Sequence, residues 1–189
     1  PQPSVQPTPA PSPTPSPGEE PGRAELTVYL SFQCTGGGGL AQILDQLDAE
    51  GVKALFLFRP EELEANGENL RRIVGSGHAV GLSVEGTTLS QVEERLDQGE
   101  ALLDRLVRLK THTVYLEQAG RDVSSALSEE GWACWSPQLD QTGDTRSAAT
   151  RSNALMNRFD SRTGSVRVML DDRPGTADLL DRLLPRMER

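Results

Sequence analysis

The sequence predicts an α/β domain built on a mostly parallel β-sheet and preceded by a proline-rich segment. Three observations lead to this fold class. Short apolar runs of strand length alternate with segments whose apolar residues recur at helical spacing. The run Ala54 to Phe58 is apolar at every position, as in parallel strands covered on both faces. Nine of the 13 prolines lie between Pro1 and Pro21. Regular βα alternation predicts right-handed crossovers in a sheet that is either open or closed into a barrel.

The first 23 residues are expected to be a disordered linker, since proline alternates there with Ser, Thr, Gln and Ala and leaves no hydrophobic face to bury. The folded domain is then expected over residues 24–189. A polyproline II spacer of this length could hold a domain up to about 60 Å from an anchor, at ~3.1 Å per residue. Because the sequence opens at Pro1, we expect that an upstream signal or anchor has been removed and that the domain is exported.

The first half of the domain is expected to contain two strands and two helices. A strand over Leu26 to Phe32 is followed by a helical pattern that starts at Leu40, and Gly51 supplies the C-terminal stop. Ala54 to Phe58 forms the second strand. Pro60 then opens one helical segment that Gly75 closes.

The second half continues the alternation. Ala79 to Val84 reads as a strand, and Ser90 with Glu93 forms a capping box that starts a long helix. Further strands are expected at Thr113 to Leu116, Trp132 to Trp135 and Val166 to Leu170, and further helices at Asp122 to Glu130, Ala148 to Phe159 and Thr176 to Leu184.

The charge of the chain excludes some partners. The formal net charge is -9, which opposes nucleic acid and anionic lipid, because both need clustered Lys and Arg. No apolar stretch approaches the roughly 18 residues of a membrane span, so we expect no membrane insertion by this segment. Aromatic residues make up only 4% of the chain, so a ligand site would be built mainly from aliphatic and polar groups.

The two cysteines, Cys34 and Cys134, have no Cys or His at zinc-ligand spacing. They either pair in a disulfide that closes a loop of about 100 residues or remain as buried free thiols. The two histidines, His78 and His112, also lack a second ligand at metal spacing, and we expect both to be hydrogen-bonded structural residues.

Candidate ligand positions lie at the carboxyl ends of the parallel strands, where ligands bind in such folds. The run Gly36 to Gly39 follows the first strand, either as an anion-binding loop or as a flexible connection, and it lacks the residues of a P-loop. Asp171 and Asp172 follow a strand and either face a ligand or form a turn. Trp132 and Trp135 bracket another strand and either stack on sugar or belong to the core. These acids and indoles form a possible groove.

Taken in order, these segments resemble the polysaccharide deacetylases of the NodB-homology group, carbohydrate esterases that remove acetyl groups from chitin-like or peptidoglycan sugars. The resemblance covers roughly Leu26 to Met187. It is carried by Leu30 to Phe32, Leu44 to Phe58 and Asn69 to Gly81, with weaker support from Gly131-Trp132 and Gly164-Ser165. It implies a distorted (β/α) barrel with mostly parallel strands. It also implies a divalent metal held by one Asp and two His, a second Asp as general base and a late His as general acid.

The resemblance places unsuitable residues at each of these functional positions. Gln33 stands at the base and Cys34 at the metal-binding Asp; Ser83 and Thr87 stand at the two histidines, and Leu170 at the general acid. None can supply the original chemistry, because metal-assisted hydrolysis needs a Lewis acid, an activated water and a proton donor together. The Arg-Pro-Pro-Tyr-Gly motif of the group falls on Leu116 to Gly120 and keeps only the glycine. We therefore expect no metal and no cofactor.

Two hypotheses of function follow from the resemblance. The first is a non-catalytic domain, extracellular or attached to the cell envelope, that binds cell-wall glycan or an envelope protein. The second is a divergent hydrolase of carbon–nitrogen or ester bonds in acetylated carbohydrate, with a rebuilt site that uses Cys34, His78 and Asp171. Metal content of the purified protein separates the two.

Overall fold

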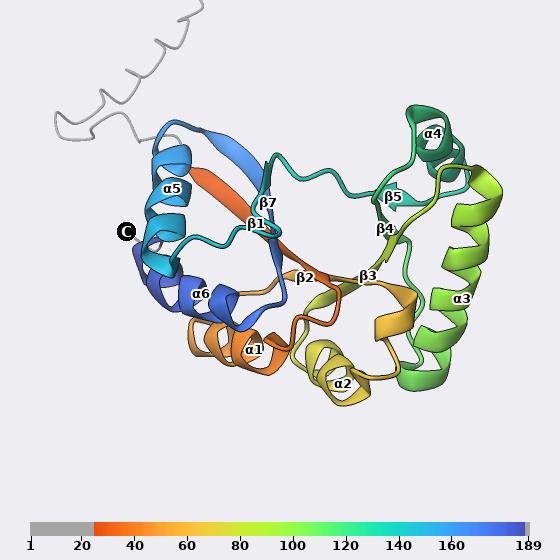
Figure 1. Cartoon of the computed structure of the whole chain (residues 1–189), viewed down its shortest axis with the longest axis horizontal. Helices are drawn as coiled ribbons and strands as arrows, with labels where there is room; N and C mark the ends of the chain where they lie inside the picture. The colour runs from red at the N-terminus through yellow and green to blue at the C-terminus, as the bar shows by residue number, and fades with distance from the viewer. Residues whose placement is uncertain (1–24, 188–189) are drawn as a thin grey trace, which may run out of the picture.

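A computed structural model of the chain describes residues 25–187. The predictions for the proline-rich segment, residues 1–23, therefore lie outside the described residues. Over the described range, strands and helices alternate along the chain, and the strands curl into a half-barrel with the helices outside it (Figure 1).

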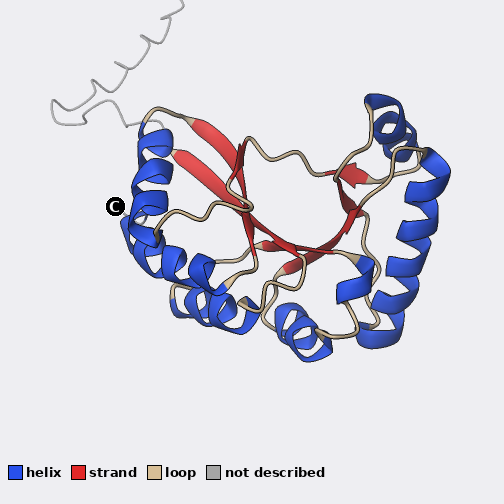
Figure 2. Ribbon diagram, in the orientation of Figure 1, coloured by secondary structure: helices blue, strands red, loops and turns tan. Residues whose placement is uncertain are grey.

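All strand pairings within residues 25–187 are parallel, in a seven-stranded sheet of order β5-β4-β3-β2-β1-β7-β6. Figure 2 shows the strands as one curved layer that stays open between β5 and β6. The strands are β1 (Leu26–Cys34), β2 (Leu55–Phe58), β3 (Ala79–Val84), β4 (Thr113–Leu116), β5 (Ala133–Cys134), β6 (Leu139–Asp140) and β7 (Gly164–Asp171).

The helices follow the strands in the expected order. They are α1 (Leu40–Ala49), the 3-10 turn η1 (Pro60–Glu62), α2 (Gly67–Gly75), α3 (Leu89–Val107), α4 (Arg121–Glu129), α5 (Ala148–Asp160) and α6 (Pro174–Met187). No helix among residues 25–187 combines the length and the apolar character that crossing a bilayer requires.

Side chains alternate between the two faces of the sheet because successive residues of a strand point in opposite directions. On β1, Leu30, Phe32 and Cys34 join the main hydrophobic core beneath the helices. Ser31 and Gln33 lie on the other, concave face. A small apolar cluster of Leu55, Leu57 and Met169 lies on this face, with Tyr115 and Trp135 packed against it. We call these three residues the inner plug.

Several expected elements differ from the observed ones. The segment opened by Pro60 is not one helix, because η1 ends at Glu62 and α2 starts at Gly67. The capping box of α3 is formed by Thr88 and Gln91 rather than by Ser90 and Glu93. Thr88 has extended backbone angles and accepts a hydrogen bond from the Gln91 N–H, whereas Ser90 already lies within the helix.

Candidate functional site

Four polar side chains meet on the concave face at the carboxyl ends of β1 to β4. Gln33 Nε2 donates to Ser83 Oγ at 3.2 Å, and Ser83 Oγ donates to Glu117 Oε1 at 2.8 Å. Arg59 grips the same carboxylate with two hydrogen bonds, Nε to Oε1 at 2.8 Å and Nη2 to Oε2 at 2.7 Å. We call Gln33, Arg59, Ser83 and Glu117 the inner polar cluster.

The position of each residue in its strand explains why the cluster forms. Gln33 and Ser83 occupy inward-facing positions of β1 and β3, one residue away from outward-facing core residues. Arg59 follows the last residue of β2, and Glu117 follows the last residue of β4. In a parallel sheet these ends share one edge, so charges far apart in the sequence become neighbours.

The pairing with Arg59 keeps Glu117 ionised. Partial burial raises the pKa of the Glu117 carboxyl, but hydrogen bonds from Arg59 and Ser83 outweigh it, so the pKa lies below its ordinary value. The Glu117 side chain is 11% exposed and that of Arg59 is 34% exposed. The carboxylate is therefore the more enclosed partner of a bidentate ion pair.

The inner polar cluster is poorly suited to hydrolysis. The hydrogen bond from Ser83 to Glu117 resembles a nucleophile beside a base, but Ser83 is fully buried, and a carboxylate with a lowered pKa is a weak base. The Gln33 amide cannot accept a proton near neutral pH. No side chain in the cluster combines exposure with the basicity that general-base catalysis needs.

The residues also do not fit the divalent metal that the resemblance implies. Within residues 25–187, no group of three or more His, Cys, Asp or Glu side chains could hold a metal ion. Glu117 is the single carboxylate of the cluster, and both its oxygens already accept from Arg59. A metal placed here would face the guanidinium charge and two neutral side chains, Gln33 and Ser83, which are weak ligands.

A pocket of about 550 Å³ opens beside the cluster at the same edge of the sheet. Glu85 and Gln118 follow β3 and β4 and are joined by a hydrogen bond of 2.9 Å. The lining residues, which we call the carboxyl-end pocket, are Glu61, Glu85, Gly86, Thr87, Gln91, Glu94, Arg95 and Gln118. Carboxylates and amides dominate this lining, so it offers hydrogen-bond acceptors and donors rather than an apolar surface.

The glycine-rich loop between β1 and α1 is occupied by the protein's own carboxylate. Gly36 N and Gly37 N donate to the two Asp172 carboxylate oxygens at 3.2 and 3.0 Å. The loop does bind an anion, but that anion is Asp172, whose side chain is thereby withdrawn from any groove. Burial raises the pKa of Asp172 above its ordinary value despite these hydrogen bonds.

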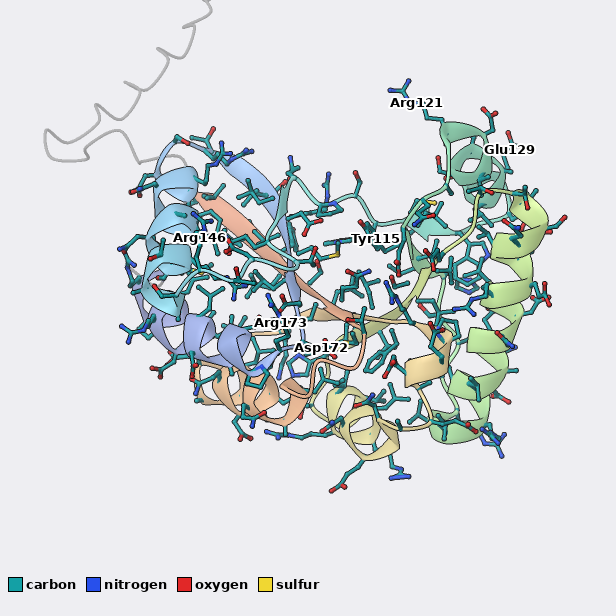
Figure 3. All side chains as sticks on the ribbon, in the orientation of Figure 1. Tyr115, Arg121, Glu129, Arg146, Asp172 and Arg173 are labelled. Atoms are coloured by element: carbon teal, nitrogen blue, oxygen red, sulfur yellow. The ribbon has the colours of Figure 1, made fainter. Side chains whose placement is uncertain are left out.

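Asp171 is held in a similar way by neighbouring donors. Its carboxylate accepts from Gly143 N at 3.1 Å, from Arg173 Nε at 2.8 Å and from Thr176 Oγ1 at 2.5 Å. Figure 3 places Asp172 and Arg173 together near the start of α6. Asp171 and Asp172 therefore connect the end of β7 by hydrogen bonds to the loop before α1 and to the loop before α5.

The possible disulfide between Cys34 and Cys134 is not formed, and both are free thiols. They lie on β1 and β5, with β2, β3 and β4 between them. Cys34 Sγ lies 3.7 Å from Phe32 O in the main core, whereas Cys134 Sγ lies 3.7 Å from Ser124 O of α4, so the two thiols have different surroundings. Burial, followed by the charges of Asp172 and Glu62, raises the Cys34 pKa well above its ordinary value, so this thiol stays protonated.

The two tryptophans of the possible groove lie on different sides of the sheet. Trp132 packs against the main core and meets His112 edge to face. Trp135 packs against the inner plug and donates from Nε1 to Ser31 Oγ at 3.0 Å. They therefore do not form one sugar-stacking surface with each other.

The rebuilt hydrolytic site of the second hypothesis is not assembled. Cys34 is buried in the main core at the carboxyl end of β1, whereas His78 lies just before the amino end of β3. His78 Nδ1 accepts a hydrogen bond from Ala54 N at 3.2 Å, as expected for a structural histidine. Leu170, where the resemblance places the general acid, is fully buried in the main core. Thr87 reaches only Gln91 at the rim of the carboxyl-end pocket.

Sequence reasoning gave no role to Arg59 and Glu117, which the structure shows to be the charged pair of the cluster. The available signal was their position, since each directly follows a strand at its carboxyl end. Their pairing could not be read from the sequence, because 58 residues separate them and β3 lies between their strands.

Comparisons with known proteins identify the fold. The sequence matches no protein-family model and no curated protein. The structure is similar to that of the Bc1960 peptidoglycan N-acetylglucosamine deacetylase, with a TM-score of 0.75 and 20% identity over 86% of this chain and 81% of that one. It is also similar to the polysaccharide deacetylase Bc1974 from Bacillus cereus, with a TM-score of 0.74 and 14% identity over 86% of this chain and 87% of that one.

A third similar structure is BA3943 from Bacillus anthracis, a CE4 family pseudoenzyme, with a TM-score of 0.76 and 15% identity. The match covers 86% of this chain but 60% of BA3943. These similarities confirm the expected distorted (β/α) barrel with mostly parallel strands, which is the fold of the NodB-type deacetylases.

Proposed function

We propose that this chain is a non-catalytic domain with the deacetylase fold, located outside the cell or in its envelope, that binds cell-wall glycan. The observation that carries the proposal is the inner polar cluster, in which Arg59 neutralises Glu117 at the edge where the resemblance implies a metal. A charge-balanced ion pair therefore lies where the deacetylases that this chain resembles would have their metal centre. Pseudoenzymes with this fold exist, BA3943 being one.

The carboxyl-end pocket supports the choice of glycan as ligand. It is polar and lies beside the cluster, and carboxylates and amides such as Glu85 and Gln118 suit the hydroxyl groups of sugars. Two of the structurally similar proteins are deacetylases named for peptidoglycan or polysaccharide. An envelope protein is the alternative ligand, and no feature of the pocket favours it over sugar.

The first test concerns catalysis. The purified chain is equilibrated with zinc, cobalt or nickel, its metal content is measured, and acetate release is followed on acetylated glucosamine oligomers and on peptidoglycan. We expect no stoichiometric metal and no acetate release, and no activity from a single reversion such as Gln33→Asp, because ligands, base and acid are all changed. About one tightly held metal per chain, or acetate release, would overturn the non-catalytic assignment.

The second test concerns binding. Calorimetric titration with glucosamine oligomers and sedimentation with insoluble peptidoglycan should both detect binding, and Glu85→Ala with Gln118→Ala should weaken it severalfold. Arg121→Ala with Glu129→Ala is the matched control, since both side chains lie on α4, away from the concave face (Figure 3). Equal loss in both double variants, or no binding by the native chain, contradicts the assignment of this pocket.

A further inference from the structure

A second pocket lies at the opposite, amino-terminal ends of the strands, where the resemblance implies no function. Its volume is about 440 Å³. Its lining, which we call the amino-end pocket, includes Tyr29 on β1, Lys53 before β2, Thr113 on β4 and Trp135 after β5. None of its lining residues belongs to the inner polar cluster or to the carboxyl-end pocket, so it is a separate site.

The amino-end pocket has the chemistry of a groove for a proline-rich peptide. Tyr29 is 52% exposed and is the one exposed large hydrophobic side chain among residues 25–187. Trp135 lines the same pocket, and its hydrogen bond to the buried Ser31 fixes the indole ring. Aromatic-lined grooves bind extended proline-rich segments, whose stiffness lowers the entropy lost on binding.

The chain carries such a segment directly before the pocket. From Pro11 to Pro17 every second residue is proline. The described structure begins at Glu25, and β1 starts at Leu26, so the chain enters the domain at the amino-end edge. Val28 and Tyr29, within the first residues of β1, already line the pocket.

We propose that residues 11–17 of this chain dock into its own amino-end pocket and pack against Tyr29 and Trp135. In a polyproline II helix with three residues per turn, prolines at alternate positions point to all sides in succession. A proline therefore faces the aromatic rings whichever way the segment is rotated. The proposal does not depend on the function of the carboxyl-end pocket.

The length of the connection allows this docking. The pocket extends from β1 to β5, which are four strand spacings or at most about 19 Å apart. Residues 18–24 span about 20 Å when extended, at ~3.1 Å per residue. The dipeptides Pro17-Gly18 and Pro21-Gly22 in this connection are of the kind that favours turns.

Charge complementarity favours the same occupant. Lys53 lines the amino-end pocket and forms no ion pair within the described range, residues 25–187. Glu19 and Glu20 lie between the proline run and the domain. The negative charge of this connection is complementary to the positive charge of Lys53.

The test uses Trp135 as a reporter in a Trp132→Phe background of the full chain. Quenching of Trp135 emission by acrylamide is measured for the native proline run and for a chain of equal length in which Pro11, Pro13, Pro15 and Pro17 are each changed to Ser. We expect the four substitutions to increase quenching severalfold, because the docked segment shields the indole. Hydrogen exchange of the backbone around Val28 and Trp135 should rise in the same variant.

A variant of the pocket itself turns this test into a double-mutant cycle. Tyr29→Ser removes one wall of the pocket, so in that background the four proline substitutions should change quenching no further. The proposal is overturned if these substitutions change neither quenching nor exchange when Tyr29 is present, or if they act equally in both backgrounds. A difference that grows with protein concentration would show docking between two copies and would also overturn it.

Discussion

At the scale of single residues, the ion pair of Arg59 and Glu117 links the ends of β2 and β4 above Ser83 on β3. Its partners are unequally exposed, 34% for the arginine and 11% for the glutamate side chain. We predict that Arg59→Met lowers the free energy of unfolding by about 2 kcal/mol, because it leaves an enclosed carboxylate without its counter-charge. Glu117→Gln should cost less, since water can still solvate the arginine. Urea unfolding of both variants measures the difference.

The double variant Arg59→Met with Glu117→Gln is the control for this asymmetry. If the two residues stabilise each other, the double variant is more stable than the sum of the single losses implies, with a coupling of about 1–3 kcal/mol. Strict additivity would show that the ion pair contributes nothing beyond its separate side chains.

His78 should make stability depend on pH. Its Nδ1 accepts from the Ala54 N–H, and its surroundings include Asp48, Lys53 and Arg72. Burial, with smaller repulsion from the two cations, lowers the His78 pKa below 6.5 despite attraction to Asp48. The unfolded chain therefore binds more protons below about pH 6.5, so the stability present above that pH is lost as the pH falls toward the folded-state pKa.

We predict that His78→Gln removes this loss, which would be visible as a flatter plot of unfolding free energy as the pH falls below about 6.5. An unchanged slope in His78→Gln would show that His78 is not the cause of the pH dependence.

Glu117 should affect stability at lower pH than His78 does. Its pKa lies below 4.5, so the stability that it contributes persists above that pH and is lost as the pH falls further.

The roles of single residues were only partly predictable from the sequence. The resemblance places Gln33 at the general base and Ser83 at a metal-binding histidine of the deacetylases. It can do so because a sequence motif fixes the position of a residue along its strand. It could not show that Cys34 points into the main core while Gln33 points inward, since that depends on the pleat and on which face the helices cover. Arg59 and Glu117 have a role only as a pair, and pairing is a property of the folded sheet.

At the scale of elements, the loop between β1 and α1 illustrates two different needs for glycine. Gly38 has a φ of +82° and open space where a Cβ would stand, whereas Gly39 has a φ of -105° and lies against the Arg173 backbone. A Cβ on Gly39 would lie 2.4 Å from the Arg173 carbonyl carbon. One position needs glycine for its conformation and the other for its closeness to the turn after β7.

We predict that Gly38→Ala costs about 1 kcal/mol in unfolding free energy, from backbone strain alone. Gly39→Ala should cost about 3 kcal/mol, because the turn that holds Asp172 must move to make room. The second change should also disturb the hydrogen bond from Gly39 N to Asp172 O, at 2.6 Å. Thermal unfolding ranks the two variants, and equal losses would contradict the close packing of the two loops.

Most elements were predictable because their hydrophobic patterns are local. The strands over Ala79–Val84 and Thr113–Leu116 have the expected bounds, and α5 and α6 lie where the helical spacing placed them. β6 was missed because its two residues, Leu139 and Asp140, carry no periodicity of their own and become a strand only by pairing with β7. Capping at Thr88 was missed for a similar reason, since Ser90 offered an equally good local motif.

At the scale of the whole molecule, one continuous core joins the described elements. The main hydrophobic cluster includes residues of β1, β2, β3, β4 and β7 together with side chains from the helices on the convex face. Such a core has no internal boundary at which part of the sheet could separate and remain folded. Residues 25–187 should therefore unfold in one cooperative transition.

Removal of Pro1 to Gly22 tests this cooperative unfolding. The shortened chain should keep a single transition, with coincident curves from circular dichroism and Trp fluorescence, because residues 25–187 hold a continuous core of their own. Its unfolding free energy should fall by only a small part of the ~5–15 kcal/mol typical of a domain, the part that docking at the amino-end pocket contributes. Limited proteolysis of the full chain should likewise leave a resistant fragment that starts near Ala24. A broad or biphasic transition in the shortened chain would instead make the proline-rich segment an integral part of the fold.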